Sequence, residues 1–272
     1  MKNSLNKTPQ AETFKKEFLK KYLEKAPISL ALIRAAECHE LSKEDYLRPV
    51  LDIGCGNGLF TSILFEDTID TGLDISSKEI REAKKTSKYK YLVASNIEQI
   101  SFKDGSFSTI FSNSVLEHLT DLNKALKEIH RILKKDGTLI FTTYTEAFGD
   151  TLFYSKILAK LRLSGIAGFY SKTINQIFNH KNLFSLEEWK EILAKNGFKV
   201  IEFEHYFPEK IMNIFDLFLP FSLFNLLWVK LFLKWKPFST KLLVKIAYFF
   251  FKSAFNDSKQ IGCGLKFTLK KL

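Results

Sequence analysis

The sequence predicts an α/β fold in which strands and helices alternate, and three observations support this prediction. An apolar strand runs into a glycine-rich turn in the stretch VLDIGCGNG, residues 50–58. A second apolar run, TGLDIS at residues 71–76, carries Asp74 about 20 positions after Gly54, the spacing that returns a second strand beside the first in a βαβ unit. Two further apolar runs also lead into polar residues, at 91–94 and 107–113.

The glycine-rich turn indicates a nucleoside-like ligand rather than a dinucleotide. Gly54, Gly56 and Gly58 have the spacing G-x-G-x-G, whereas a dinucleotide fingerprint has the spacing G-x-G-x-x-G. Glycines permit tight or positive-φ conformations and place no Cβ between the strand end and a ligand. Asp52, at the carboxyl end of the strand, is placed to bind an amine or a hydroxyl. The pattern therefore argues against NAD and for a ligand with no phosphate to cradle.

Asp74 lies at the carboxyl end of the second predicted strand, where an acid can hold both hydroxyls of a ribose. An alternative role for this aspartate is to cap the helix that begins near Ser76. Because the acid occurs together with the glycine-rich turn at the predicted spacing, the ribose role is favoured.

The order of these motifs resembles the class I S-adenosylmethionine-dependent methyltransferases, in the broad group that includes the ubiquinone and menaquinone C-methyltransferases. The similarity covers residues 49–145 and comprises VLDIGCGNG, GLDIS, ASNIEQISFKDGSFSTIFSNSVLEHL and ALKEIHRILKKDGTLIFTT. The last stretch reads as a helix over 125–133, a turn at 135–137 and a fifth strand. The resemblance implies a Rossmann-like sheet of seven strands with the seventh antiparallel, helices on both faces, and S-adenosylmethionine as cofactor.

The resemblance also implies a role for each residue of a cofactor site. The three glycines of the turn would pack against the methionine part, Asp74 would hold the ribose, and Asp52 would contact the amino-acid end directly or through water. Asn96 stands where the family usually has an aspartate that accepts from the adenine amino group, and asparagine can still accept through Oδ1. Ile97 follows as an apolar neighbour of the ring. The other expected cofactor contacts are Cys55, Ile75 and Asn113.

Helical segments precede and follow this region. Residues 11–25 and 28–41 read as two amphipathic helices separated by Pro27, placed to cover the cofactor pocket. After the fifth strand, residues 146–182 form an insertion with apolar residues at helical spacing. This insertion is expected to be broken by Gly165 and Gly168.

The chain then returns to the pattern of the fold. A helix begins after Ser185, and Glu188 three residues later completes a capping box. The remaining predicted elements are the end of this helix at 196–197, a sixth strand at 199–207 and a seventh strand at 262–269.

A segment inserted between the sixth and seventh strands, residues 208–258, has the composition of a membrane-interfacial hairpin. Residues 211–229 carry one charge, Asp216, whereas the following stretch is basic and contains no acid up to residue 252. Its six lysines are Lys230, Lys234, Lys236, Lys241, Lys245 and Lys252. A basic amphipathic helix beside an apolar one is typical of proteins that lie in an anionic membrane interface.

The topology of the sheet limits what this insertion can do. Because both flanking strands belong to one sheet, the insertion leaves and returns on the same side of a bilayer, so two spans or none are allowed. Lysines on the second helix disfavour a two-span hairpin. We therefore expect an interfacial hairpin that turns at 235–237. The alternatives are a substrate lid, which is compatible with a membrane role, and a homodimer interface.

Charge and cysteine content narrow the partners and the compartment. The net charge of +11 comes mainly from lysines interleaved with apolar residues, unlike a phosphate-binding groove, so nucleic acid is disfavoured as methyl acceptor. Cys38, Cys55 and Cys263 show no paired spacing and are expected to be free thiols in a reducing compartment. The basic N-terminus has no apolar run behind it, which predicts a cytoplasmic protein, peripheral on the inner face of the membrane.

The cofactor implied by the resemblance determines the chemistry expected of the protein. A sulfonium methyl group is already activated, so the protein supplies positioning and, for a hydroxyl acceptor, a general base. His118, just beyond the fourth strand, is the first candidate for this base, although its ring could equally serve only to line the pocket. Tyr144 and His180 are further candidates. No metal site is predicted, because the other histidines lack a partner at ligand spacing, namely His39, His130 and His205.

These patterns divide the chain into three parts. They are an N-terminal helical cap (1–48), an S-adenosylmethionine-binding methyltransferase domain (49–207 and 259–272) and the apolar basic insertion (208–258). The predicted function is methyl transfer to an apolar or lipid-linked acceptor at a membrane surface. The alternatives are a soluble small-molecule O- or N-methyltransferase and a scaffold that binds the cofactor without turnover.

Overall fold

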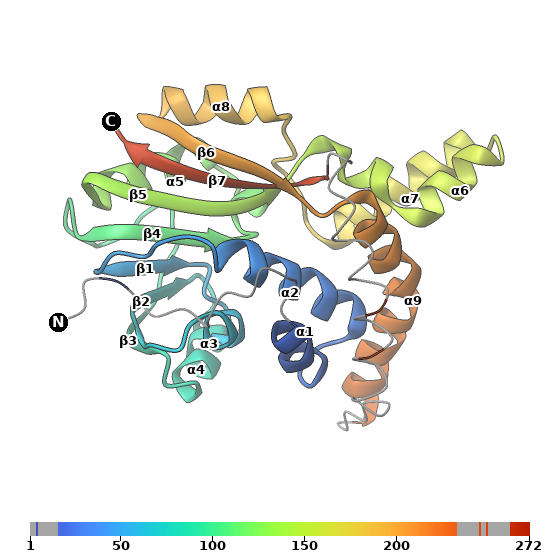
Figure 1. Ribbon diagram of the computed structural model, residues 1–272, viewed down its shortest axis with the longest axis horizontal. Helices are drawn as coiled ribbons and strands as arrows, with labels where there is room; N and C mark the ends of the chain where they lie inside the picture. The colour runs from blue at the N-terminus through green and yellow to red at the C-terminus, as the bar shows by residue number, and fades with distance from the viewer. Residues whose placement is uncertain (1–3, 5–15, 233–244, 246–248, 250–261) are drawn as a thin grey trace.

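A seven-stranded sheet of order β3-β2-β1-β4-β5-β7-β6 forms the centre of the protein (Figure 1). The structure is a computed structural model and describes residues 4, 16–232, 245, 249 and 262–272. The strands are β1 (Val50–Ile53), β2 (Ile69–Asp74), β3 (Tyr89–Ala94), β4 (Phe107–Asn113), β5 (Leu133–Tyr144), β6 (Phe198–Tyr206) and β7 (Gly264–Lys271). The first five strands pair in parallel, and β7 is antiparallel to both β5 and β6. The predicted seven-stranded sheet is thereby confirmed.

Helices cover both faces of this sheet, as predicted. They are α1 (Lys16–Leu23), α2 (Ile28–Leu41), α3 (Leu59–Leu64), α4 (Ser77–Lys85), α5 (Leu122–Ile132), α6 (Phe153–Lys160), α7 (Ser164–Ile177), α8 (Leu186–Lys195) and α9 (Glu209–Phe232), with 3₁₀ turns η1 (Leu116–His118) and η2 (Glu146–Thr151). Val50 packs in a hydrophobic cluster with residues of α1, α2 and α9, whereas Leu51 packs with residues of α5 and α8. Successive side chains of a strand point to opposite faces, so the sheet separates two cores.

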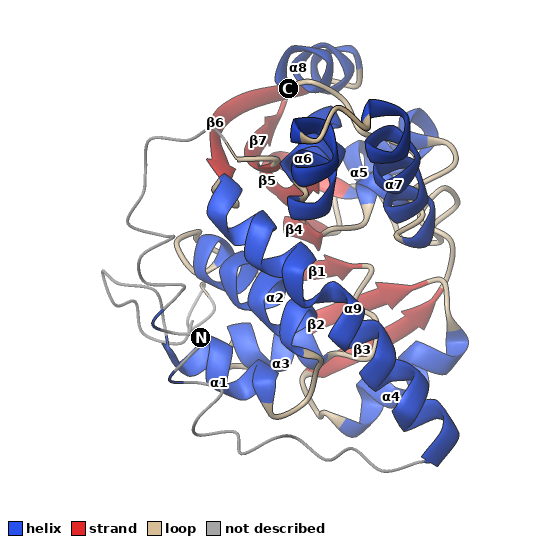
Figure 2. Cartoon of the chain, turned by 90° about the vertical axis from the view of Figure 1, so that its right-hand side faces the viewer, coloured by secondary structure: helices blue, strands red, loops and turns tan. Residues whose placement is uncertain are grey.

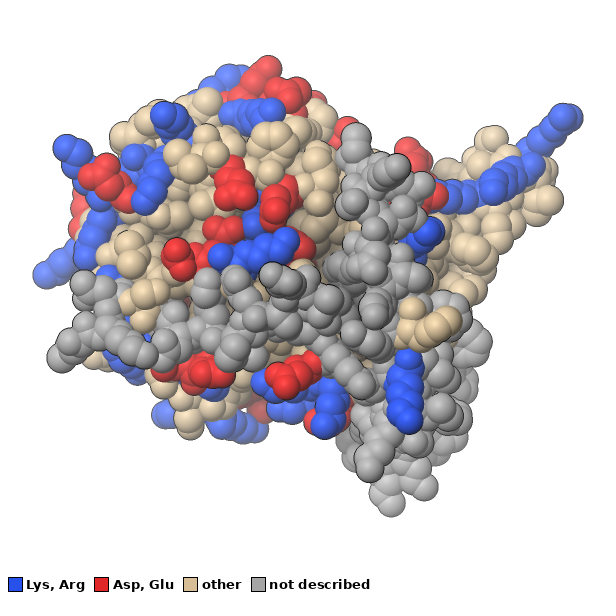
Figure 3. All heavy atoms as spheres, viewed as in Figure 1, with Lys and Arg blue, Asp and Glu red and all other residues tan. Residues whose placement is uncertain are grey.

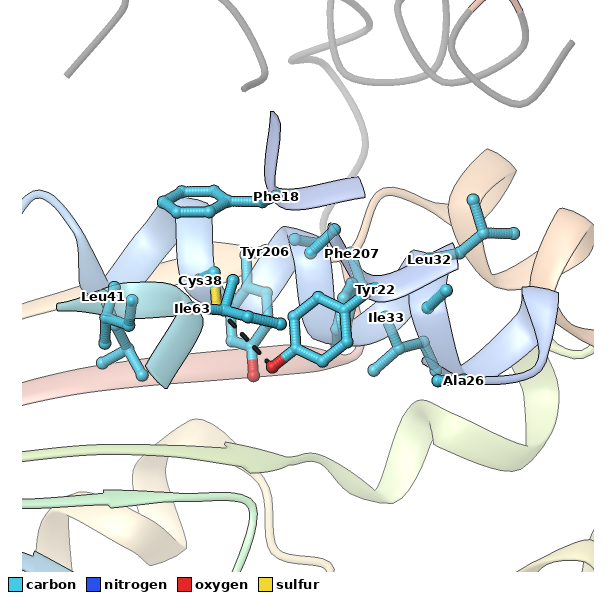
Figure 4. Packing of buried hydrophobic residues seen from close by; sticks show 14 of the residues in the cluster. Phe18, Tyr22, Ala26, Leu32, Ile33, Cys38, Leu41, Ile63, Tyr206 and Phe207 are labelled. Atoms are coloured by element: carbon cyan, nitrogen blue, oxygen red, sulfur yellow. Dashed lines mark hydrogen bonds between the residues drawn. The ribbon is translucent and has the colours of Figure 1, made fainter. Parts of the chain in front are cut away.

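The N-terminal helices pack as a layer on the first of these cores. Pro27 lies between α1 and α2 as predicted, while residues 11–15 of the expected first helix lie outside the described residues. Figure 4 shows Tyr22 of α1 beside Cys38 of α2, with the Tyr22 hydroxyl 3.9 Å from the Cys38 sulfur. Phe207, which follows β6, is buried in the same cluster. These helices are therefore part of the core.

The break in the insertion after β5 differs from the prediction. The sequence predicted breaks at Gly165 and Gly168, but both glycines lie inside α7. The break falls at residues 161–163, where Arg162 has a φ of 61°. A Cβ at either glycine would meet nothing within 4 Å, so packing does not require glycine there. A helix tolerates such a residue at a cost of about 1 kcal/mol relative to alanine.

The boundaries of α5 and β5 also differ from the prediction. The helix begins at Leu122 rather than 125, because Asp121 caps it by accepting from the Lys124 amide. The turn expected at 135–137 lies within β5, where Asp136 has a φ of 60° and the register against β4 shifts. The capping box at Ser185 is present as predicted.

The first helix of the predicted insertion, α9, packs across the domain. It contacts α2 and α6 and runs along one side of the molecule (Figure 2). Asp216, the one charged residue between 211 and 229, is buried and accepts hydrogen bonds from the Tyr170 hydroxyl and the Tyr154 amide. Within the described residues, none of the helices has the length and apolar character needed to cross a membrane. The turn predicted at 235–237 lies outside the described residues, as do Lys234, Lys236, Lys241 and Lys252.

Candidate active site

The turn from β1 to α3 borders a cavity of about 240 Å³ at the carboxyl edge of the sheet, which we call the glycine-turn cavity. Gly54 and Gly56 have φ values of 73° and 51°, in the region that favours glycine. A Cβ on Gly54 would lie 2.3 Å from the Val115 side chain, whereas a Cβ on Gly56 would meet nothing within 4 Å. Packing therefore requires the first glycine, and the second leaves open space beside the cavity.

Asp74, at the end of β2, is held in place by the backbone. Its Oδ2 accepts from the Gly56 amide at 2.8 Å, and its Oδ1 accepts from the Ser76 amide at 2.8 Å. The cap of α4 is Ser76, whose hydroxyl accepts from the Glu79 amide. Asp74 is thus not the helix cap, and each of its carboxylate oxygens keeps acceptor capacity for a ligand.

Asp52 is buried at the end of β1 and has two partners that the sequence analysis missed. Its Oδ2 accepts from the Thr61 hydroxyl at 2.5 Å and from the Tyr89 hydroxyl at 2.6 Å. Burial raises the pKa of Asp52 to about 6, although these two hydrogen bonds oppose the shift. The carboxyl group still lines the glycine-turn cavity.

The predicted cofactor residues fall into two groups. The residues that line the glycine-turn cavity are Asp52, Gly54, Cys55, Gly56 and Asn113. The others lie at or just after the ends of neighbouring strands, except Gly58, which precedes α3. Ile75 is 73% exposed beside Asp74, and Asn96 is exposed after β3, with its Oδ1 accepting from the Glu98 amide. Ile97 is buried in the second core, and Gly58 faces Thr86 and Tyr89.

A buried glutamate on α2 joins the cavity to the strand ends. One oxygen of Glu37 accepts from Arg34 at 2.7 Å and from Asn113 at 2.8 Å. The other accepts from the Ser114 hydroxyl at 2.7 Å and lies 3.4 Å from the Tyr144 hydroxyl. Glu37 is fully buried, so it positions groups from α2, β4 and β5 around one carboxylate.

A second, smaller cavity of about 80 Å³ adjoins the first, since Leu30 and Arg34 line both. We call it the aromatic pocket; rings supply much of its wall, from His118, Tyr144, Phe148, Phe178, His180 and Phe215. The rings of His118 and His180 are stacked with centroids 5.5 Å apart, and that of Tyr144 lies 5.4 Å from His180. The three candidate bases, distant in the sequence, therefore meet in one pocket.

Hydrogen bonds assign the tautomer of His118. Its Nδ1 lies 3.1 Å from the Asn179 carbonyl oxygen, which can only accept, so Nδ1 carries the proton and Nε2 has a free lone pair. Burial lowers the pKa of His118, and burial followed by the proximity of His118 lowers that of His180 to about 4. Both rings are neutral at neutral pH.

Glu117, beside His118, is a buried carboxyl group that the sequence analysis also missed. Neither of its oxygens makes a hydrogen bond to the described residues, and its side chain is fully buried. Burial raises the pKa of Glu117 to about 8. At neutral pH the group is therefore mainly a neutral acid, which avoids an unpaired buried charge.

Comparison with known proteins agrees with this geometry. Residues 51–141 match the family described as methyltransferase domain. An uncharacterised protein of Methanocaldococcus jannaschii is 33% identical over 181 residues, covering 64% of this chain and 75% of the relative. The chain belongs to the class I S-adenosylmethionine-dependent methyltransferases.

Two malonyl-[acyl-carrier protein] O-methyltransferases are also similar to this methyltransferase. The protein from Legionella pneumophila is 29% identical over 102 residues, covering 35% of this chain and 36% of the relative. The protein from Priestia megaterium is 31% identical over 177 residues, covering 58% of this chain and 61% of the relative. The alignments thus leave a substantial part of both relatives uncovered.

Solved structures share the fold of the methyltransferase. Geranyl diphosphate C-methyltransferase from Streptomyces coelicolor, in complex with S-adenosyl-L-homocysteine, has a TM-score of 0.52 at 15% identity and covers 90% of this chain and 84% of its own. The [4+2]-cyclase SpnF has a TM-score of 0.55 at 17% identity and covers 91% of this chain and 83% of its own. At such identities the similarity concerns the fold.

The cofactor of this methyltransferase is S-adenosylmethionine, and the glycine turn fits it. The open space at Gly56, the fixed carboxylate of Asp74 and the exposed apolar side chain of Ile75 suit a methionine chain, a ribose and a flat base. Among the described residues, no group of three or more histidine, cysteine, aspartate or glutamate side chains could hold a metal ion.

The candidate site residues that the sequence analysis missed share one property. Arg34 and Glu37 lie on α2, and Glu117 lies in a short 3₁₀ turn, so none of them directly follows a strand. One signal was available: Arg34 and Glu37 are opposite charges three residues apart, and apolar residues surround Arg34 in the helix ISLALIRAAECHEL. The fully buried Glu37 of this pair requires partners from elsewhere in the fold.

Proposed function

We propose that this methyltransferase acts on an apolar or lipid-linked acceptor at a membrane surface. The aromatic pocket carries the proposal, because it adjoins the glycine-turn cavity through Leu30 and Arg34. A pocket walled by aromatic rings favours an acceptor with an apolar or aromatic part, and its few polar groups orient that acceptor.

In this proposal the residues at the strand ends hold the cofactor. Asp74 accepts from the ribose hydroxyls, and Asp52 meets the amino-acid end directly or through water. The glycines of the turn lie against the methionine part, and Arg34 adds a cation for its carboxylate. Asn96 and Ile97 lie on the adenine side, next to Ile75. The backbone hydrogen bonds of Asp74 support its part, because they fix the carboxylate before ligand binds.

His118 acts as the general base when the acceptor is a hydroxyl. S-Adenosylmethionine supplies an activated methyl group. The bond between this methyl group and sulfur would break as the acceptor oxygen bonds to the methyl carbon, and Nε2 of His118 would take the proton of that hydroxyl. The free lone pair on Nε2 supports this role, since the Asn179 carbonyl fixes the proton on Nδ1. Tyr144 orients the acceptor and is held near Glu37.

The three-part organisation of the chain follows from the same proposal. Residues 1–48 form a cap over the glycine-turn cavity, supported by Tyr22, Leu30 and Arg34 in its lining. Residues 208–258 cover the aromatic pocket and meet the membrane, supported by Phe215 of α9 in the lining of that pocket. Each lysine near an anionic surface contributes on the order of 1 kcal/mol. The methyltransferase domain then comprises residues 49–207 and 259–272.

The names of two relatives also support a carried acyl acceptor. Both are called malonyl-[acyl-carrier protein] O-methyltransferases. An oxygen acceptor on an acyl chain is consistent with a neutral histidine base beside an aromatic wall. A lid over a small water-soluble acceptor is the other use that α9 supports, because its Phe215 reaches the same pocket.

Turnover with fractionated extracts tests the acceptor class. The purified protein is incubated with S-adenosylmethionine and either a lipid extract or the water-soluble fraction of the same cells, and S-adenosylhomocysteine release is measured. We expect release with the lipid extract and a lipid product heavier by one methylene group. Release with only the water-soluble fraction would favour the small-molecule reading. Cofactor binding without release in either would identify a scaffold.

Vesicle flotation tests the membrane part of the proposal. The variant Lys241→Glu/Lys245→Glu/Lys252→Glu reverses three charges of the insertion and leaves the cofactor residues unchanged. Wild-type protein is expected to float with vesicles that contain phosphatidylglycerol at low salt, and to be released as salt screens charges beyond about 8–10 Å. The variant should keep its cofactor affinity and stay with the soluble fraction. Wild-type protein that never floats would contradict the membrane proposal.

A further inference from the structure

Helices α6 and α7 form a hairpin that projects from the body of the domain (Figure 1). Its tip, residues 160–169, exposes large apolar side chains: Leu161 is 63% exposed, Ile166 53% and Phe169 72%. Leu163 is exposed as well. A set of large apolar side chains gathered at one projecting tip is uncommon on a protein surface and indicates an interaction site.

The charge of this hairpin has one sign. Residues 151–185 contain five cations and no acid. Two of the cations are engaged near the base, Lys156 with Glu209 and Lys181 with the Thr120 hydroxyl. The other three are exposed: Lys160 and Arg162 lie at the tip, and Lys172 lies further along α7. In Figure 3 the visible side of the projection carries Lys and Arg side chains among uncharged ones.

These two properties together select the partner. Exposed aliphatic and aromatic side chains beside cations, with no acid nearby, complement an interface of anionic headgroups and acyl chains. A projecting tip also offers little area to a rigid protein, since a stable protein interface buries roughly 800 Å² on each partner. A fluid lipid surface can close around such a tip.

We propose that the α6–α7 tip inserts into the interface of an anionic lipid membrane. The inference rests on the proposed function, because it adds a second docking element to the insertion at residues 208–258. Leu161, Ile166 and Phe169 enter the region between headgroups and acyl chains. Lys160 and Arg162 pair with lipid phosphates at the rim of the tip, and Lys172 does so further along α7.

The tip lies on the same side of the molecule as helices that border the aromatic pocket (Figure 2), so membrane docking would bring the pocket near the lipid surface. Just beyond α7, Phe178 and His180 form part of the wall of that pocket, and Phe215 of α9 forms another part. Figure 2 shows α6, α7 and α9 on the same side of the molecule. The hairpin therefore holds a lipid surface on the side of the molecule where α7 and α9, the helices next to these pocket residues, lie. An apolar acceptor reaches the pocket from that surface with a short path through water.

Site-specific fluorescence and vesicle binding test the proposal. The three native cysteines are buried, so a cysteine introduced at the surface can be labelled selectively with a polarity-sensitive dye. The variant Leu161→Cys places the dye at the tip, and Ile201→Cys places it on an exposed apolar position of β6 as a matched control. With phosphatidylcholine vesicles that contain phosphatidylglycerol, the tip dye should shift to the blue and the β6 dye should not. Equal responses of the two dyes would overturn the proposal.

A second set of variants measures the contribution of the tip to affinity. Leu161→Ser/Phe169→Ser should weaken vesicle partitioning by about tenfold or more, whereas Ile201→Ser should leave it nearly unchanged. All three side chains are exposed, so folding and cofactor affinity are expected to stay intact, which circular dichroism and calorimetry verify. Unchanged partitioning of the tip variant would overturn the proposal.

The same measurements separate the tip from the proposed function. Vesicle binding that depends on Lys241, Lys245 and Lys252 but not on the tip would leave the proposed function standing and remove only the tip. Suppose that the wild-type protein binds no vesicles yet methylates an acceptor of the lipid extract dispersed in detergent. That result would contradict both proposed docking elements but would still support a lipid acceptor. If the tip variant loses binding to a protein but vesicles never bind, a protein partner replaces the lipid surface and the proposal is wrong.

Discussion

The Nε2 atom of His118 lies 4.0 Å from Oε1 of Glu117, a carboxyl group that is completely buried. Nδ1 of the same ring is directed at the Asn179 carbonyl, so the free lone pair of the ring is on the side of the carboxyl. Burial keeps the pKa of Glu117 high, at about 8. At neutral pH this carboxyl carries no charge, so it does not oppose the lowering of the His118 pKa by burial.

Replacing the proposed base tests its role in turnover. His118→Ala is expected to lower kcat by roughly 10²–10⁴-fold for a hydroxyl acceptor, because no general base remains to accept the proton of the hydroxyl. Affinity for S-adenosylmethionine should change little, since His118 lines the aromatic pocket and not the glycine-turn cavity. Steady-state kinetics and calorimetry measure the two effects. Loss of folding with normal residual turnover would show that the ring only packs.

The pH dependence of turnover follows from the lowered pKa of His118. Burial moves this pKa below its ordinary value of 6.5, so the base stays unprotonated and active below that pH. The acidic limb of kcat should therefore have its midpoint below pH 6.5, when the cofactor is saturating. His180, with a pKa of about 4, and Asp52, with a pKa of about 6, titrate nearby, and Asp52 is expected to affect cofactor affinity. A midpoint above 6.5 would contradict a buried neutral base.

Glu117→Gln is expected to stabilise the protein in a pH-dependent way. The pKa of Glu117 is raised by burial from 4.5 to about 8, so the folded state binds its proton more tightly than the unfolded chain does. The stability from this group is complete below pH 4.5 and is lost as the pH rises to about 8. Glutamine mimics the protonated acid at every pH, so the gain should grow to a few kcal/mol at pH 8.

Urea unfolding at pH 5 and at pH 8 measures this difference. Glu191→Gln provides a matched control, because Glu191 is an exposed glutamate on α8 and its replacement should shift both midpoints equally. A gain for Glu117→Gln that is the same at both pH values would mean that the carboxyl is not held neutral in the fold.

How much was predictable depends on where each contact partner lies in the chain. Asp52, Gly54 and Asp74 could be predicted as candidates because the strand, the turn and the acid follow one another within a short stretch, and local sequence determines that pattern. Glu37 was not predicted, because its hydrogen bonds are to Asn113 and Ser114, which lie 76 and 77 positions away in the sequence. Such contacts are set by tertiary packing.

The same reasoning explains the misplaced helix break. Gly165 and Gly168 raise the energy of a helix locally, and the sequence offers no stronger signal between residues 146 and 182. The break falls instead at residues 161–163, with Arg162 in a left-handed conformation. Ala167 and Ile174 of α7 are buried, and this packing keeps the glycines within the helix. Propensity is weak compared with the burial of a helix face.

Removing the carboxylate at the end of β2 tests the cofactor site. Asp74→Ala is expected to weaken binding of S-adenosylmethionine and S-adenosylhomocysteine by about 1.5–3 kcal/mol, because charge-assisted hydrogen bonds to the ribose are lost. Asp70→Ala serves as a control on the same strand, since Asp70 pairs with Arg48 and Lys90 at its other end. Calorimetry with unchanged affinity in Asp74→Ala would refute the ribose assignment. NAD is expected not to bind to either protein.

Breaking the ion pair of Arg34 and Glu37 is expected to lower both the stability of the protein and its affinity for the cofactor. Arg34→Met keeps most of the side-chain stem but removes the cation, and it leaves the fully buried Glu37 with only neutral donors. We expect a loss of about 3 kcal/mol in the free energy of unfolding, since a buried charge without its partner is costly. Glu37→Gln alone should also destabilise, because it leaves Arg34 uncompensated.

The double variant Arg34→Met/Glu37→Gln completes the cycle. It is expected to recover part of the stability lost in Arg34→Met, because no unpaired charge remains, and the coupling should exceed about 1 kcal/mol. Cofactor affinity should stay low in the double variant, since Arg34 lines the glycine-turn cavity and its cation is absent. Unfolding in urea at pH 7 and calorimetry supply the two readouts. Strictly additive losses of stability would mean that the 2.7 Å ion pair does not organise the site.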